Sequence, residues 1–573
     1  MSNRGAAIVA AVLLLTMPLP AVGQDGRVPL VAPAGSDAAA RAAVAALPRA
    51  TAVNDADGNK LFDDLDQSFR TSRGGRVPVI VSFVAGTSTP DGVAGVRDVA
   101  PDAVVRRSFE IIPAFAGDLT SAEAARVAAL GSVRQLELDS AGSLELDTAT
   151  HIMGADAVVD QLGVTGSLDG QPDVATSGDV GIAVLDTGFH TAHQELRDKL
   201  IAWRDFGTNR TAPYDPDGHG THVANIAAGW GANPAYRGVA PGASLIGVKI
   251  DGGANTESST IAGYEWIVQR KAELNVRVAT ISFGFGAATD GTSALERAVD
   301  AAWNAGIVCF KSNGNSGPGK STMTVPAAAR GIIAVGNILD PKGVPNATAF
   351  GFALSHSSSR GPTSDGRVKP DLVAPGSSIM AADAPTSSGY VSLSGTSMAS
   401  PFAAGAAALM IAANPALGPD ETRSIMTSTT ADFGAPGADN EYGHGRLRVW
   451  HAVAEVLRRQ GLDTGTSTPP AVPNHQAFAT ATPTTGVFET AVTVRDTAFP
   501  VAVTAIGDTA VGAVGMFDAA GNAVGGPTSL PNNGPDRQHG VSFASSAPGT
   551  YTLRVVAPPT SPLVVDVSHS TAE

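Results

Sequence analysis

The chain has 573 residues, well above the roughly 300 at which a single hydrophobic core stops growing, so we expect several structural units. Hydrophobic residues make up 43% and charged residues 16% of the sequence, a balance that excludes a wholly disordered chain. The formal net charge of −15 argues against nucleic acid or an anionic membrane as the main partner, because those surfaces bind basic patches.

Residues 1–23 have the three parts of a secretory signal peptide. Arg4 supplies a positive charge, residues 6–17 an apolar core and residues 21–23 a small-residue cleavage site. An anchoring helix is the alternative, but the apolar run is shorter than the roughly 20 residues that span a bilayer. We therefore expect a secreted protein, extracellular or in the periplasm or cell envelope, with no membrane span after signal removal.

Residues 24–147 precede the main unit and contain a compact segment at about 75–139. Short Val-rich runs and one helical pattern in this segment predict a small α+β module. The expected elements are strands at 77–84, 104–109, 114–119 and 133–138 and a helix at 121–130.

Residues 148–458 are predicted to form a parallel sheet covered by helices. Their strand-like runs are apolar without alternation, as strands buried on both faces should be, at 180–185, 245–250, 278–283, 306–310 and 332–335. An alanine-rich run at 398–413 resembles a membrane span but is too short, so we expect a buried helix. Sheets of this class carry functional groups at the carboxyl ends of their strands.

Beyond this unit, residues 459–476 are rich in Thr, Gly and Pro and predict a linker. Residues 477–573 then predict a β-sandwich of short strands separated by turns. The expected strands are 491–494, 501–505, 511–517 and 550–556.

Three short motifs place an acid, a histidine and a serine at the ends of expected elements. Asp186 ends an apolar strand in Val-Leu-Asp-Thr-Gly, His219 begins a helix, and Ser397 opens the alanine-rich helix. Each is weak alone, because Asp-Thr-Gly also occurs in aspartic proteases and turns, and a serine before a helix is often an N-cap. His219 and His222 also suggest zinc, but the Glu of an H-E-x-x-H motif and a third ligand are missing.

Together, the motifs resemble those of the subtilisin-like serine peptidases, in which acid, histidine and serine follow in this chain order. The resemblance covers about residues 151–455 and extends to the segments 238–243, 280–284, 313–318, 358–362 and 369–376. It implies a subtilisin-like α/β fold and a serine endopeptidase that requires no cofactor for its chemistry. Structural calcium is frequent in this family, although the sequence shows no compact ligand cluster and metal sites remain unknown.

The resemblance also assigns roles to individual residues. Ser397 is the expected nucleophile, His219 its general base and Asp186 the group that orients the imidazole. The side chain of Asn315 and the backbone N–H of Ser397 are the expected oxyanion donors, and His222 is expected to be structural. The expected substrate-binding residues are Ser282, Phe283, Gly284, Ser312, Asn313 and Gly314.

The module at about 75–139 resembles the inhibitory propeptide of the family, with a ferredoxin-like α+β fold. This implies a zymogen that is inhibited by its own propeptide and cuts itself within a processing segment at about 140–150. The expected partners are protein or peptide substrates, with no nucleic acid, and we expect a monomer.

The expected pocket walls around Phe283 and residues 310–313 carry no Asp or Glu, so we expect a broad or apolar side-chain preference. A dedicated processing peptidase with one protein target remains an alternative. A non-catalytic binding protein on a peptidase scaffold is disfavoured, because all three triad residues and Asn315 are present.

Overall fold

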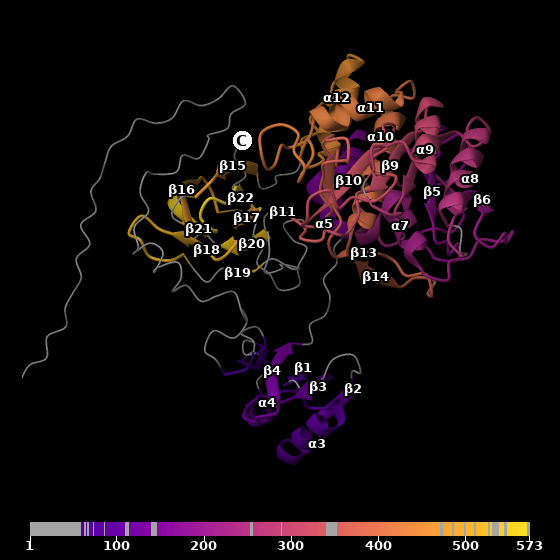
Figure 1. The fold of residues 1–573 in the computed structure, drawn as a ribbon. Helices are drawn as coiled ribbons and strands as arrows, with labels where there is room; N and C mark the ends of the chain where they lie inside the picture. Colours follow the sequence, from indigo (N-terminus) through magenta and orange to yellow (C-terminus); the bar gives the residue numbers. More distant parts are fainter. Residues whose placement is uncertain are drawn as a thin grey trace, which may run out of the picture.

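The computed structural model folds the chain into three units, which Figure 1 shows in colours that follow the sequence. It describes residues 59–569, except for gaps at 62–64, 66–67, 71, 73, 85, 109–113, 139–145, 253–255, 288, 340–351, 470–473, 484–485, 498–499, 509–510, 525–527, 530–537 and 544–546. The predicted signal peptide at 1–23 and the first half of the predicted processing segment lie outside the described residues.

The first unit is a small α+β module with a four-stranded antiparallel sheet. Its elements are β1 (Val77–Phe83), α3 (Thr89–Val99), β2 (Val104–Ser108), β3 (Ala114–Leu119), α4 (Ser121–Ala128) and β4 (Val133–Leu138). The strand order β2-β3-β1-β4 is the split β-α-β arrangement of ferredoxin-like folds. All five elements expected here from the sequence are present, with ends that differ by two residues or fewer.

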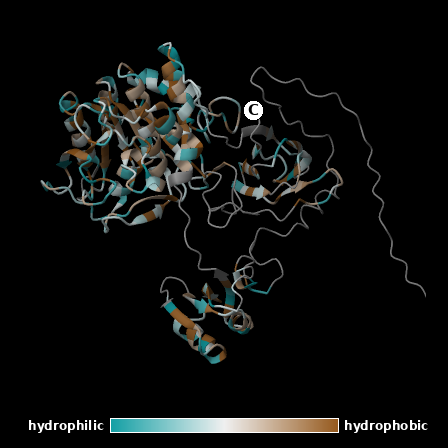
Figure 2. Ribbon diagram, turned by 180° about the vertical axis from the view of Figure 1, so that it is seen from behind, coloured by the Kyte–Doolittle hydropathy of each residue, from teal (hydrophilic) through white to brown (hydrophobic). Residues whose placement is uncertain are grey.

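Helix α3 was not predicted, because two glycines inside it lower its intrinsic helix propensity. Ser88 compensates by accepting a hydrogen bond from the backbone N–H of Asp91, which caps the helix, and Val93 and Val96 bury its inner face. The apolar core of the module contains residues from Leu61 to Leu136 and none from the other units. Figures 1 and 2 show the module standing apart from the rest of the molecule in both views.

The second unit is built on a mostly parallel sheet. Its elements are α5 (Leu146–Met153), α6 (Ala155–Leu162), β5 (Gly181–Asp186), β6 (Leu200–Asp205), α7 (His219–Ala228), η1 (Pro234–Tyr236), β7 (Ser244–Lys249), α8 (Thr256–Gln269), β8 (Val276–Ile281), α9 (Ala294–Asn304), β9 (Val308–Ser312), β10 (Ile333–Leu339), β11 (Ala353–Leu354), β12 (Leu372–Pro375), β13 (Ile379–Ala382), β14 (Tyr390–Leu393), α10 (Thr396–Ala413), α11 (Pro419–Ser428) and α12 (Val449–Arg459).

Strand order in this sheet is β11-β10-β9-β8-β5-β7-β6, with β12 also paired to β10. Its pairs are parallel except for β10 with β11, which confirms the α/β fold class. The five predicted strands correspond to β5, β7, β8, β9 and β10, whereas β6, β11 and β12 were missed. Strand β6 lies at the edge of the sheet and is half-exposed, and charged residues on both sides limit its apolar run to residues 200–203.

The alanine-rich run forms helix α10, which packs on α7 and on strands β8, β9, β10 and β12. Within the described residues, α10 is the one helix long and apolar enough to cross a membrane, and 89% of it is buried inside the unit. A helix that is apolar all round and enclosed in this way is a core helix. Its N-terminus carries Ser397.

The third unit is a β-sandwich of two antiparallel sheets, ordered β15-β22-β17-β20-β19 and β16-β21-β18. Its strands are β15 (Asn474–Ala481), β16 (Val487–Val494), β17 (Val501–Gly507), β18 (Val514–Phe517), β19 (Thr528–Ser529), β20 (Gln538–Phe543), β21 (Gly549–Val556) and β22 (Leu563–His569). Side chains from both sheets meet in one apolar cluster. The linker predicted at 459–476 covers the connection between α12 and β15 but also includes the last residue of α12 and the first three residues of β15.

Strand β17 is buried on both faces, which places the sandwich directly against the second unit. Val501, Val503 and Ala505 enter the sandwich core, whereas Ile506 belongs to the core of the α/β unit. Strand β17 also contacts β11. The two units therefore share a buried boundary, unlike the first module.

Candidate active site

The carboxyl end of β5 meets the start of α7, and there Asp186 and His219 form a direct pair. The Nδ1 atom of His219 donates to Oδ1 of Asp186 at 2.6 Å, and the backbone N–H of Thr187 donates to the same oxygen at 2.8 Å. Asp186 is fully buried, whereas the ring of His219 is 22% exposed. This arrangement fixes the imidazole and leaves its Nε2 edge for a reacting partner.

The charge of the His219 ring is set by its carboxylate neighbours. Burial disfavours the imidazolium, but Asp186, Asp217 and Asp215 outweigh this effect and raise the pKa of His219 to about 9. A raised pKa means that an imidazolium formed during a reaction would be stabilised, chiefly by Asp186.

Two small residues allow α7 to approach β5 this closely. The Oγ1 atom of Thr187 accepts from the backbone N–H of Gly220 at 2.8 Å and donates to Asp215 at 2.9 Å. A Cβ on Gly220 would lie 2.3 Å from the carbonyl oxygen of Gly188, so a larger residue would push the helix and its histidine away.

Ser397 lies in the first turn of α10, and the segment after β8 connects it with His219. Its Oγ donates to the carbonyl of Ser282 at 3.4 Å, and Oγ of Ser282 donates to the carbonyl of Ser397 at 2.9 Å. The ring of the next residue, Phe283, contacts the ring of His219 edge-on with centroids 6.3 Å apart. The hydroxyl of Ser397 thus bonds to Ser282 and not to His219 in this structure, as is common before substrate binds.

Asn315 lies beside the start of α10, and its amide orientation is fixed. Its Oδ1 accepts from both the backbone N–H and the hydroxyl of Thr396, each at 2.9 Å, which leaves Nδ2 as the outward donor. A Cβ on Gly395 would lie 3.1 Å from this Nδ2, so a glycine keeps the donor uncrowded. The backbone N–H of Ser397 belongs to the first turn of α10 and has no partner within the helix.

The predicted substrate-binding residues divide into two groups. Gly284 and Gly314 both lie next to Thr324. A Cβ at Gly284 would be 2.1 Å, and one at Gly314 3.4 Å, from Oγ1 of Thr324. Ser312 and Asn313 instead have buried side chains, and Nδ2 of Asn313 donates to the carbonyl of Ser359 at 2.6 Å. The expected pocket-wall role of the Asn313 side chain is therefore not supported, because this side chain is buried and its amide bonds to the backbone of Ser359.

Lys311 is a polar residue whose position the sequence did not reveal. Its ammonium group is fully buried and donates to the carbonyl and hydroxyl of Ser312. Burial lowers the pKa of Lys311 to about 7. It thus bonds to Ser312, the last residue of β9, which lies three positions before Asn315.

His222 is buried one turn after His219, and Nε2 donates to the carbonyls of Ile379 and Val391 at 3.0 Å each. Burial lowers the pKa of His222 to about 4, so its ring is neutral and ties α7 to the β13–β14 hairpin. Among the described residues, no group of three or more His, Cys, Asp or Glu is arranged to hold a metal ion.

Sequence reasoning missed the residues that hold the site in place. Thr396 orients the Asn315 amide, and Thr187 with Asp215 joins β5 to α7. Thr187 follows Asp186 and Thr396 precedes Ser397 in the sequence motifs. Their membership in these motifs was the signal that could have identified them. No local pattern marked Asp215, which is two residues from Asp217 and bonds to Thr221.

Comparisons with known proteins identify similar sequences and structures. The sequence profile of the Subtilase family, Peptidase S8, matches residues 177–445. The serine protease AprX of Bacillus subtilis is 36% identical over 344 residues, 56% of this chain and 74% of that protein, and subtilisin DY of Bacillus licheniformis is 33% identical over 47% and 89%. A solved structure of sphericase aligns with a TM-score of 0.41 and 28% identity over 48% of this chain and 93% of that one.

The similarity to AprX covers 74% of that protein, and the family match at 177–445 includes Asp186, His219 and Ser397. The chain therefore belongs to the subtilase family, and it is a subtilisin-type serine endopeptidase that acts on proteins or peptides.

Proposed function

We propose that Ser397 is the nucleophile, that His219 is its general base and that Asp186 orients and stabilises the imidazole. Nε2 of His219 takes the proton of Ser397 as Oγ attacks the scissile carbonyl, and the same proton then passes to the leaving amine. A water hydrolyses the resulting ester by the reverse sequence, which restores the hydroxyl. The observation that carries the proposal is the 2.6 Å bond between His219 and the buried Asp186.

The tetrahedral intermediate places a negative charge on the former carbonyl oxygen. We propose that Nδ2 of Asn315 and the backbone N–H of Ser397 donate to it. The two bonds from Thr396 support this role, because they hold the amide with its nitrogen outward before substrate arrives. Removing one such donor costs about 10² to 10³ in kcat, a range that comes from subtilisin itself.

The direct test is cleavage of casein and of a mixed peptide library by the matured protein, with and without phenylmethylsulfonyl fluoride. We expect cleavage that the reagent abolishes, with its adduct on Ser397 in a peptide mass map. Labelling elsewhere, or no cleavage by matured protein, would contradict the proposal. A single cut site would favour the processing-peptidase alternative over broad or apolar specificity.

We further propose that the chain is secreted and made as a zymogen, with the α+β module as an intramolecular inhibitor that is released by a cut in the following segment. The self-contained core of the module supports this, because a unit that must leave has to fold apart from the peptidase. Mass and N-terminal sequence of the matured protein test the proposal: residues 24–138 should be absent from the mature chain.

A further inference from the structure

The loop from Asn313 to Thr322 carries Asn315, and a neighbouring segment holds this loop along its length. The backbone N–H of Ser359 donates to the carbonyl of Gly314 at 2.9 Å, and Oγ of Ser359 accepts from the N–H of Ser316 at 3.0 Å. Farther along, the backbone N–H of Thr322 donates to the carbonyl of Arg360, and the backbone N–H of Arg360 donates to the hydroxyl of Thr322, each at 3.0 Å. Segment 357–361, here called the backing segment, therefore holds the loop in place through hydrogen bonds.

Arg360 anchors this backing segment from inside the protein. Its guanidinium group is fully buried and pairs with Glu441, while Nε donates to the carbonyl of Ser358 at 2.8 Å. Nη2 donates to the carbonyl of Ser355 at 3.3 Å. A buried cation needs nearly all of its donors satisfied, so its position is sensitive to each partner.

The last partner of Arg360 comes from the β-sandwich. Nη2 of Arg360 donates to Oε1 of Gln538 at 2.6 Å, and Nε2 of Gln538 donates to the carbonyl of Leu354 at 2.7 Å. Gln538 begins strand β20 and is 1% exposed. The sandwich thus supplies one buried amide that satisfies a donor on Arg360 and an acceptor on β11.

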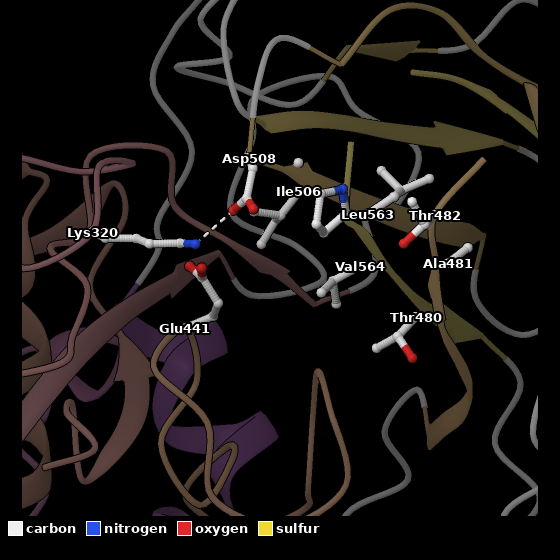
Figure 3. Close-up of a pocket in the computed structure, with 11 residues that line it drawn as sticks. Lys320, Glu441, Thr480, Ala481, Thr482, Ile506, Asp508, Leu563 and Val564 are labelled. Atoms are coloured by element: carbon white, nitrogen blue, oxygen red, sulfur yellow. Dashed lines mark hydrogen bonds and ion pairs between the residues drawn. The ribbon is translucent and has the colours of Figure 1, made fainter. Parts of the chain in front are cut away.

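The two units also line an open groove, which Figure 3 shows. The groove has a volume of about 410 Å³ and is lined by Lys320 of the loop, Glu441 and the ends of β15, β17 and β22. Lys320 pairs there with Asp508 of the sandwich at 2.6 Å, but both side chains are well exposed. Exposed pairs contribute little, so the buried contact of Gln538 is the stronger connection.

From these contacts we propose that the β-sandwich positions the oxyanion loop, and that Gln538 is a positioning residue for Asn315 acting through Arg360 and segment 357–361. The inference rests on the proposed role of Asn315 as an oxyanion donor. When Gln538 cannot bond to Arg360, the guanidinium shifts toward other partners, and the backing segment moves with it. Oxyanion donors must lie within a few tenths of an ångström of their target to be effective.

The test measures kcat and KM for Gln538→Met in the full chain, normalised to active sites titrated with phenylmethylsulfonyl fluoride. Methionine keeps the volume of the side chain but removes both hydrogen bonds. We expect kcat to fall about 3- to 30-fold with KM nearly unchanged, because an oxyanion contact acts in the transition state. If this variant does not fold, Gln538→Asn, which keeps the amide but is one methylene shorter, decides the matter instead.

The matched control is Glu489→Gln, which breaks the Glu489–Arg554 ion pair in the other sheet of the sandwich and leaves Arg360 untouched. It perturbs the sandwich without altering the contact with the peptidase, so its kcat should stay within about twofold of wild type. An equal loss of kcat in both variants would mean that general destabilisation is responsible and would overturn the proposal.

A double-mutant cycle with Asn315→Leu separates the proposal from the function on which it rests. If Gln538 acts through Asn315, the kcat loss from Gln538→Met should disappear when Asn315 is already leucine. A loss that persists, or an unchanged kcat in Gln538→Met alone, overturns the inference. A normal kcat in Asn315→Leu alone would instead contradict the proposed oxyanion role.

Discussion

The two units that flank the peptidase differ in how they join it. The α+β module has a core of its own, which ends at Leu136, and in both views it stands apart. The β-sandwich instead gives Ile506 to the core of the peptidase and Gln538 to its buried arginine. A separable core suits a unit that leaves during maturation, whereas a shared buried boundary suits one that stays.

Replacement of the nucleophile should have the largest effect on the difference between the two flanking units, because the α+β module should then remain attached to the peptidase. Ser397→Ala should lower kcat by about 10⁶, the size of the loss when subtilisin loses its nucleophile. The precursor should then stay uncut, which intact-protein mass measures. Adding a trace of active wild-type enzyme is the control for a cleavable segment. A variant that matures when produced alone would contradict self-processing.

The shared boundary predicts a large stability loss when Arg360 is removed. Arg360→Ala leaves Glu441 without its buried partner and several acceptors unpaired, so the free energy of unfolding of the peptidase should fall by about 3 to 5 kcal/mol. Urea denaturation in the Ser397→Ala background measures it without self-digestion.

Lys320→Ala is the control for this measurement, because it breaks an ion pair at the same boundary between side chains that are 59% and 40% exposed. It should cost at most about 1 kcal/mol. Equal losses in the two variants would mean that burial at the boundary does not determine its stability.

The separate core of the α+β module predicts that a substitution inside the module destabilises the module alone and leaves the stability of the peptidase unchanged. Phe83 is 2% exposed and packs against Phe115, so Phe83→Ala should destabilise the module by about 3 kcal/mol. In the uncut Ser397→Ala precursor, calorimetry should show the transition of the module shifted down and that of the peptidase unchanged. A joint shift of both transitions would contradict separate cores.

The sequence predicted the features that depend on residues close together in the chain. Buried parallel strands have continuous apolar runs, and Asp186, His219 and Ser397 lie inside recognisable motifs, so the sheet and the candidate triad could both be anticipated. Helix α3 and several strands, including β6, β12 and β22, were missed. The apolar runs of these three strands, at 200–203, 372–374 and 563–565, have four residues or fewer, and runs this short do not identify a strand from pattern alone.

Contacts between distant residues were out of reach of the sequence. Arg360 and Gln538 are 178 positions apart, and nothing in either local pattern marks them as partners. Asn313 illustrates the same limit, because its position next to the loop suggested a pocket wall, while its partner Ser359 lies 46 positions away. Motifs therefore identify reacting groups better than the residues that position them.

The pH dependence sharpens the comparison further, because the carboxylates that raise the pKa of His219 lie in the peptidase and not in a flanking unit. Its pKa is raised by Asp186, Asp217 and Asp215, all within the peptidase. Protonated His219 cannot accept the proton of Ser397, so kcat/KM should rise with pH through a midpoint above the usual 6.5 and up to about 9. A midpoint at or below 6.5 would contradict the raised pKa.

This midpoint should be the same in Gln538→Met as in the wild type, even though kcat falls, because the sandwich acts on the oxyanion loop and not on the base. Asp217→Asn provides the contrast: it keeps an oxygen that can accept from the backbone N–H of His219 but removes an exposed charge. It should lower the midpoint by about 0.2 to 0.7 pH units, the range expected of a surface charge. A shift in Gln538→Met as large as that in Asp217→Asn would mean that the sandwich also reaches the histidine, and the division between the two regions would fail.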